Sequence, residues 1–114
     1  MQDESSVKSP PEITKHSDSR ALALAERLHS VNARMFGAYW CSHCYNQKQA
    51  LGKEAYDRGL VEYVECAKDG SQSQFRFCRE KDVPGYPTWE IDGKLYPGEK
   101  SVEELERLLT SKGL

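Results

Sequence analysis

The sequence predicts one small α/β domain, in which a central four-stranded mixed sheet is flanked by helices. Two observations lead to this prediction. The first half alternates short apolar runs with amphipathic ones, a pattern typical of parallel strands joined by crossover helices. The second half contains a hairpin pattern, which adds antiparallel strands. The expected order is an extra N-terminal helix followed by β-α-β-α-β-β-α, and 114 residues suit a single domain.

The beginning of the chain is polar and differs from the rest. Residues 1–17 are rich in Ser, Pro and charged side chains, so burial of apolar surface would not offset the entropy of ordering them. We expect a flexible linker or an expression-vector remnant there, and a folded domain over 18–114. Apolar residues at helical spacing from Ala21 to Leu28 predict a helix over 18–30, with Ser17 as its N-cap.

Two strands and two helices are expected in the middle of the chain. Residues 33–39 and 60–66 are short apolar runs typical of strands buried on both faces. Helical spacing of apolar side chains covers 45–58. Steps of three and four residues favour a helix over 71–82, although an extended segment also fits that stretch.

A hairpin and a last helix complete the domain. Residues 88–91 and 94–96 are joined by Asp92-Gly93, the sequence that favours a type I′ turn. Ser101 and Glu104 have the spacing of a capping box and precede an amphipathic run, which predicts a C-terminal helix.

The composition argues against several classes of partner. Sixteen Lys and Arg residues against eighteen Asp and Glu give a net charge of −2, so nucleic acid is not expected as a partner. The longest apolar run, 35–41, is far shorter than the ~20 residues that span a bilayer. No secretory signal follows Met1. We expect a soluble chain whose targeting segment, if it is exported, lies elsewhere.

Cys41 and Cys44 form a C-x-x-C pair between an expected strand and an expected helix. A sulfur at the start of a helix lies near free N–H groups and the positive end of the helix dipole, which favour the thiolate. The thiolate is the nucleophile of disulfide exchange. We therefore expect Cys41 to be the nucleophile. Cys44, one turn further in and less exposed, would be the resolving thiol, because its intramolecular attack on a mixed disulfide releases the partner.

Two basic residues near this pair have alternative interpretations. A protonated His43 would stabilise the Cys41 thiolate and make the disulfide a better oxidant, or His43 would simply face solvent. Lys48, one turn after Cys44, would either influence that thiol or be exposed, and exposure is favoured.

The other two cysteines are Cys66 and Cys78, separated by eleven residues. A structural disulfide between them is favoured, and a second redox relay is the alternative. A zinc site made of four cysteines is disfavoured, because such sites usually take two close-spaced pairs and this chain has one. No metal is therefore expected.

Two segments together resemble the thioredoxin superfamily: Trp40-Cys41-Ser42-His43-Cys44 and, further along, Gly85-Tyr86-Pro87-Thr88. The resemblance implies a thioredoxin-like fold in which a cis-proline loop faces the C-x-x-C pair. Pro87 matches that proline, and Tyr86 would offer its backbone to a substrate strand. Four aromatic residues are also expected to supply core and a shallow apolar rim around Cys41, where a substrate could bind: Tyr39, Trp40, Tyr86 and Trp89.

A narrower resemblance covers about 20–109 and adds the segments 36–44, 63–66 and 84–89, together with Cys78. In these, the chain is similar to the thioredoxin-like domain fused to vitamin K epoxide reductase homologues in cyanobacteria and plant plastids. This implies a monomeric domain that oxidises protein thiols and exchanges disulfides with a membrane-embedded reductase. A quinone would bind only in that membrane partner, so no cofactor is expected in this domain. The implied compartment is oxidising, either the thylakoid lumen or the bacterial periplasm.

Two positions depart from ordinary thioredoxins. Met35 stands six residues before Cys41, where thioredoxins often carry a buried acid, so proton transfer at Cys44 needs water, Glu65 or His43. The Ser-His dipeptide in place of Gly-Pro predicts a less reducing couple. The preferred function is an oxidising thiol–disulfide oxidoreductase. The alternatives are a reductase or isomerase of protein disulfides, and a redox-inert, zinc-stabilised binding module.

Overall fold

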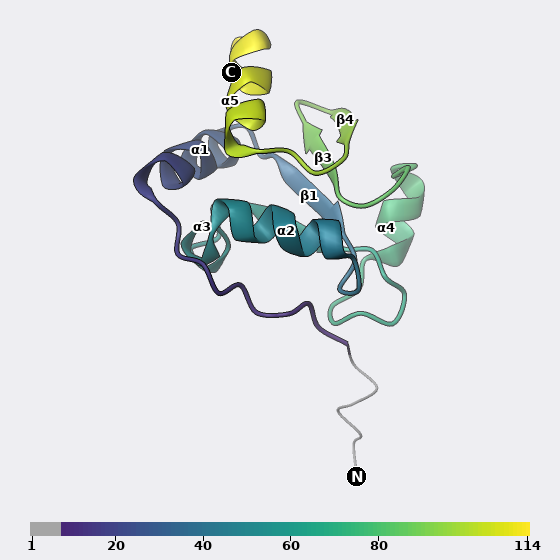
Figure 1. Ribbon diagram of the computed structural model, residues 1–114. Helices are drawn as coiled ribbons and strands as arrows, with labels where there is room; N and C mark the ends of the chain where they lie inside the picture. Colours follow the sequence, from purple (N-terminus) through teal and green to yellow (C-terminus); the bar gives the residue numbers. More distant parts are fainter. Residues whose placement is uncertain (1–7) are drawn as a thin grey trace.

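A four-stranded mixed sheet forms the centre of the structure, a computed structural model that describes residues 8–114 (Figure 1). The strands are β1 (Arg34–Gly37), β2 (Glu62–Glu65), β3 (Thr88–Ile91) and β4 (Lys94–Pro97). Their spatial order is β2-β1-β3-β4; β1 and β2 are parallel, and β3 is antiparallel to both β1 and β4. This is the four-stranded mixed sheet that the sequence predicted, and that prediction is confirmed.

The helices are α1 (Ser19–Ser30), α2 (Ser42–Leu51), α3 (Lys53–Asp57), α4 (Phe75–Glu80) and α5 (Val102–Ser111). The single helix predicted over 45–58 is wrong, because Gly52 adopts a φ of 88° and divides it into α2 and α3. A Cβ atom at this position would also lie 2.4 Å from the backbone nitrogen of Ser17, so only glycine fits. Within residues 8–114, none of the helices is long and apolar enough to cross a membrane.

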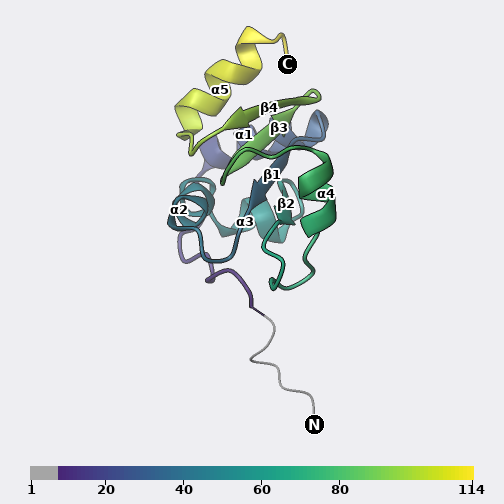
Figure 2. The same cartoon turned by 90° about the vertical axis from the view of Figure 1, so that its right-hand side faces the viewer.

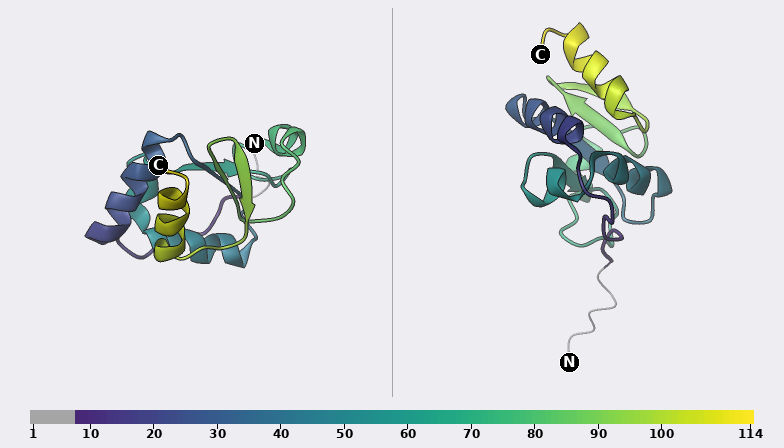
Figure 3. Two further views of the ribbon diagram at one scale, coloured as in Figure 1. Left: turned by 90° about the horizontal axis from the view of Figure 1, so that it is seen from above. Right: turned by 60° about the vertical axis from the view of Figure 1, so that its left-hand side comes forward.

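Alternation along the strands divides the core between the two faces of the sheet. On β1, Met35 belongs to the larger cluster, which packs against α1, α2, α3 and α5. Its neighbour Phe36 belongs to a smaller cluster beneath α4. The turned views accordingly show α4 on the opposite side of the sheet from α2 (Figures 2 and 3).

Local hydrogen bonds explain where the elements begin. Asp18 caps α1 by accepting a hydrogen bond from the Ala21 N–H at 2.8 Å, so the expectation that Ser17 would cap this helix is wrong. The Ser17 hydroxyl instead accepts from the Ala55 N–H in α3. The predicted capping box between Ser101 and Glu104 is present at the start of α5.

Residues 8–17, called here the N-terminal strap, lie against the folded domain (Figure 1). The Lys8 carbonyl accepts from the Ser71 N–H at 2.6 Å, and the Lys15 carbonyl accepts from the Lys53 N–H at 2.8 Å. Between them, the Gln49 carboxamide oxygen accepts from the Thr14 N–H at 2.8 Å. The sequence predicted a flexible linker over 1–17. Residues 1–7 lie outside the described residues, and the strap is attached through polar contacts that composition does not indicate. The domain boundary at residue 18 stays a prediction.

Candidate active site

Cys41 is the N-cap residue of α2 and immediately follows the turn after β1. Its Sγ accepts a hydrogen bond from the Cys44 N–H at 3.1 Å, one of the free donors at the start of the helix. Both cysteines are free thiols in this structure. Cys41 is 9% exposed and Cys44 is 2% exposed, so Cys41 is the more accessible sulfur.

The loop before β3 faces Cys41. The Tyr86–Pro87 peptide bond is cis, and the Cys41 thiol donates to the Tyr86 carbonyl across 3.6 Å. The Thr88 hydroxyl braces the same loop by donating to the Gly85 carbonyl at 2.7 Å. Segments far apart in the sequence therefore meet at the Cys41 sulfur.

An apolar rim lies beside this contact. The Trp40 side chain is 62% exposed, and its ring meets that of Tyr86 edge to face with centroids 5.9 Å apart. A large exposed aromatic next to a reactive sulfur is the kind of surface that a polypeptide substrate could contact. The structure thus brings together Trp40, Cys41, Tyr86 and Pro87.

His43 has a different environment. Its side chain is 71% exposed, and its Nδ1 lies 2.9 Å from the Glu99 carboxylate, in the loop before α5. The imidazole is therefore engaged at the surface with an acidic partner. The suggested influence of His43 on the Cys41 thiolate stays a prediction.

Cys44 is enclosed by β1 and β2. A Cβ atom at Gly37 would lie 3.0 Å from the Cys44 Sγ and 2.8 Å from Cε1 of Tyr63, so the absence of a side chain there lets both groups pack against the strand. Burial raises the pKa of the Cys44 thiol, and the hydrogen bond with Cys41 adds to the increase. Cys44 accordingly holds its proton at neutral pH, and its reaction requires a proton acceptor.

Met35 cannot accept this proton, and Glu65, one of the groups considered for that role, is engaged in other hydrogen bonds. Met35 is fully buried, and its Sδ accepts a hydrogen bond from Tyr56 at 3.2 Å. The buried Glu65 carboxylate accepts from the N–H groups of Tyr39 and Ala67, at 3.2 and 3.0 Å, and from the Tyr63 hydroxyl at 3.0 Å. These bonds fix the Glu65 side chain against the turn after β1.

The Lys48 side chain is buried, so the expectation that it would be exposed is wrong. It is only 7% exposed, and its Nζ lies 3.5 Å from the centroid of the Tyr63 ring. Burial lowers the pKa of the Lys48 ammonium to about 8. The missed signal is its spacing, because residues four apart lie on the same face of a helix and Cys44 was expected to face inward.

Cys66 and Cys78 are joined by a disulfide with a Cα–Cα distance of 5.7 Å. It connects the end of β2 to α4 within the smaller core cluster, where both residues are buried. Residues 8–114 contain no group of three or more His, Cys, Asp or Glu side chains arranged to hold a metal ion.

The arrangement defines a class of protein. A C-x-x-C pair at the start of a helix lies opposite a cis-proline loop, on a sheet in which a parallel pair is extended by an antiparallel hairpin. The predicted thioredoxin-like fold is therefore confirmed.

Comparison with known proteins identifies a curated protein that is similar to this chain. No family model matches the chain. Among curated proteins, it is 40% identical over 100 residues to the thiol-disulfide oxidoreductase LTO1 of Arabidopsis thaliana. The match covers 85% of this chain and 26% of LTO1, so the chain spans about a quarter of the length of that relative.

Two solved structures are also similar. One is the NTD_N/C domain of the alkylhydroperoxide reductase AhpF from Enterococcus faecalis, with a TM-score of 0.46 and 23% identity over 75% of this chain and 42% of that one. The other is oxidised glutaredoxin 2 from Chlamydomonas reinhardtii, with a TM-score of 0.45 and 20% identity over 82% of this chain and 94% of that one.

Proposed function

We propose that this chain is a thiol–disulfide oxidoreductase that oxidises protein thiols through a disulfide between Cys41 and Cys44. The main support is the position of the Cys41 sulfur, which accepts the Cys44 N–H at the start of α2 and faces the Tyr86 carbonyl. Similarity to a protein named a thiol-disulfide oxidoreductase adds independent support.

The reaction would proceed in two exchanges. A substrate thiolate attacks Cys41 of the oxidised pair, and the bond to Cys44 breaks, so that Cys44 leaves with the electron pair and then takes up a proton. A second substrate thiolate attacks the first substrate sulfur and displaces Cys41. The substrate loses two electrons and the domain gains them. Trp40 and Tyr86 would hold the polypeptide beside Cys41 during both steps.

After substrate oxidation, the reduced Cys41–Cys44 pair would be reoxidised by a membrane-embedded partner of the vitamin K epoxide reductase type. Only that partner would bind the quinone. The motif resemblance supports such a partner. The buried Cys66–Cys78 disulfide is in keeping with an oxidising compartment such as a thylakoid lumen or periplasm.

Equilibration with glutathione tests the direction of transfer. We expect a couple more oxidising than the roughly −270 mV of thioredoxin, and faster oxidation of a reduced unfolded protein than reduction of insulin. The Cys41→Ser variant should do neither. A couple at or below the thioredoxin value with rapid insulin reduction would favour the reductase or isomerase alternative. Stoichiometric tight zinc with no reactive thiol would favour the redox-inert module.

The partner is tested separately. Membranes that contain a purified vitamin K epoxide reductase homologue and quinone should reoxidise the reduced chain faster than quinone alone. Equal rates with and without the membrane protein would remove this part of the proposal and leave the exchange chemistry intact.

A further inference from the structure

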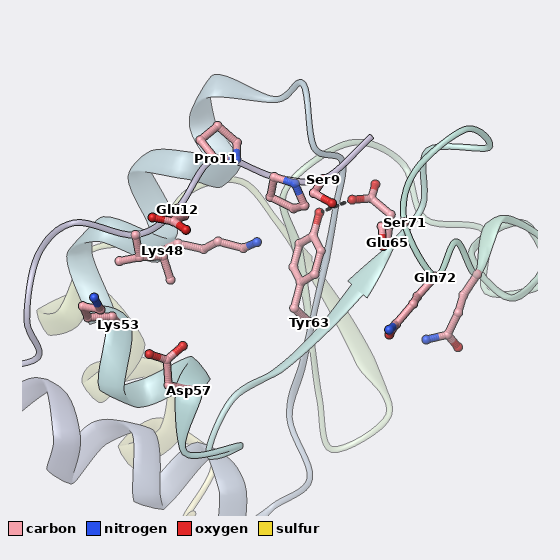
Figure 4. Close-up of a pocket in the computed structure, with 13 residues that line it drawn as sticks. Ser9, Pro11, Glu12, Lys48, Lys53, Asp57, Tyr63, Glu65, Ser71 and Gln72 are labelled. Atoms are coloured by element: carbon pink, nitrogen blue, oxygen red, sulfur yellow. Dashed lines mark hydrogen bonds between the residues drawn. The ribbon is translucent and has the colours of Figure 1, made fainter. Parts of the chain in front are cut away.

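A cavity of about 550 Å³ lies between the N-terminal strap and β2 (Figure 4). Lys48 extends into it from α2, with its amine directed toward the ring of Tyr63 (Figure 4). Although Lys48 is 7% exposed, it forms none of the ion pairs found among residues 8–114. An almost completely buried amine without a carboxylate partner is costly to the fold.

A second, smaller space connects this lysine with the redox pair. A cavity of about 10 Å³ is bordered by Cys41, Cys44 and Lys48, and it is covered by Pro10 and Pro11 of the strap. Its volume is close to what a single water molecule needs. Lys48 and Cys44 therefore border one small space, and the strap lines one side of it.

The groups around Lys48 are few and identifiable. Tyr63 of β2 and Tyr56 of α3 present their rings to the amine, with centroids 3.5 and 5.9 Å from Nζ. On its own helix, Cys44 and Tyr45 border the smaller cavity with Lys48, and Tyr39 and Cys41 border it from the preceding turn. The remaining charged side chains along the larger cavity are those of Glu12, Lys53, Asp57 and Glu65.

We propose that Lys48 exchanges the proton of the Cys44 thiol during disulfide exchange, an inference that rests on the proposed function. When the Cys41–Cys44 disulfide is opened, the departing Cys44 thiolate takes a proton from the Lys48 ammonium, leaving a neutral amine. In the reverse direction, the neutral amine removes the thiol proton. The resulting thiolate then attacks Cys41 in a mixed disulfide, and the partner leaves as a thiolate with the electron pair.

The electrostatics of the site suit this role. Burial raises the pKa of Cys44 and lowers that of Lys48 to about 8, so burial favours the neutral form of both groups. A proton carrier is most effective when its pKa lies near the working pH. Met35 carries no proton, Glu65 is held by three hydrogen bonds, and His43 is engaged with Glu99 at the surface.

Rapid mixing of the reduced full chain with the aromatic disulfide DTNB tests the proposal. Attack by Cys41 releases one coloured thiolate at a rate that depends on DTNB concentration. Attack by Cys44 on the mixed disulfide releases a second at a rate that does not. We expect the second rate constant to rise with pH through a midpoint near 8, as Lys48 loses its proton.

Two substitutions of the same lysine separate a proton carrier from a fixed charge. Lys48→Met should slow the second phase at neutral pH by at least about tenfold and should remove the midpoint. This threshold is set below the roughly 10²–10⁴-fold contribution that is typical of general-base catalysis. Lys48→Arg keeps the charge but holds its proton, so it should behave like Lys48→Met. The control is Lys53→Met, which changes a lysine of the same cavity that does not border the cysteines, and its second phase should match the wild type.

Each outcome has a separate meaning. A wild-type second phase in Lys48→Met, or a wild-type rate and midpoint in Lys48→Arg, would overturn the assignment of Lys48 while leaving the proposed function in place. Absence of the first phase in the wild type would instead remove the proposed function. A first phase that stays within about twofold of the wild type in both variants verifies that the site has kept its structure.

Discussion

Gly37 is the position where a single added methyl group should be least tolerated. An alanine Cβ there would lie 2.8 Å from Cε1 of Tyr63 and 3.0 Å from the Cys44 Sγ, whereas ordinary contacts begin at 3.4 Å. The Tyr63 ring cannot easily yield, because its hydroxyl donates to Glu65 and the Lys48 amine lies on its face. Gly37→Ala should therefore displace the groups that surround the resolving thiol.

The expected cost is that of overpacking a buried site, about 1–3 kcal/mol in the free energy of unfolding. For a domain of this size, each kcal/mol lowers Tm by roughly 4–8 °C. Chemical unfolding followed by the fluorescence of the buried Trp89 measures the loss, and calorimetry provides the Tm. The DTNB second phase should slow as well, because the added methyl group contacts Cys44.

The sign of the change in unfolding free energy tests the steric argument. Glycine normally weakens a strand, so without the close contacts Gly37→Ala would stabilise the fold. Gly85→Ala is the matched control: its Cβ would meet nothing within 4 Å, so it should be neutral or stabilise by up to about 1 kcal/mol. Gly37→Ala should also cost at least ~0.5 kcal/mol less in a Tyr63→Leu background. A cost below about 0.5 kcal/mol in the wild type, or no coupling to Tyr63, would refute the steric argument.

Three further predictions concern stability and substrate binding. The Ser17 N–H, followed by His16, lowers the pKa of Glu54 to about 2. Glu54 therefore stabilises the fold above about pH 4.5, and this stabilisation is lost as the pH falls toward 2. The Tm of Glu54→Gln should be lower than that of the wild type near neutral pH and converge with it in acid; a constant gap would contradict this. Replacing both Cys66 and Cys78 by alanine should cost about 3 kcal/mol while DTNB kinetics persist, and loss of exchange at unchanged stability would instead indicate a relay. Trp40→Ala should lower kcat/KM for protein thiols about tenfold, a contribution of ~1.4 kcal/mol, with Tm and the reaction with dithiothreitol unchanged; an equal loss with dithiothreitol would show that the rim does not bind polypeptide.

Most of the fold could be predicted because its signals are local. The short apolar runs of the strands, the Asp92-Gly93 turn and the capping box at Ser101 each act within a few residues, and both turn residues have the positive φ that a type I′ turn needs. The break at Gly52 was missed because its cause is not local. The conformation there is set by close packing against Ser17, thirty-five residues away in the sequence.

The site was predictable to the extent that its residues lie in recognisable motifs. Cys41 and Cys44 are adjacent to the start of a helix in sequence and in space, and Tyr86-Pro87 marks the opposing loop. The contact between His43 and Glu99 spans fifty-six residues, so no local pattern indicates it. The cover provided by the strap was also unpredictable, because hydrogen bonds to main-chain groups leave no signature in composition.

Burial of Lys48 is best explained by what it provides to the chemistry. Because burial lowers the pKa of the Lys48 ammonium from 10.5 to about 8, this residue destabilises the fold increasingly as the pH falls from 10.5, and the full cost is reached below about pH 8. Methionine would fill the same space without this penalty. The aromatic face of Tyr63, 3.5 Å from Nζ, offsets part of this cost. A residue that weakens the fold where an apolar side chain would strengthen it is expected at functional sites. Here the compensating gain is a proton carrier beside a thiol that burial keeps protonated.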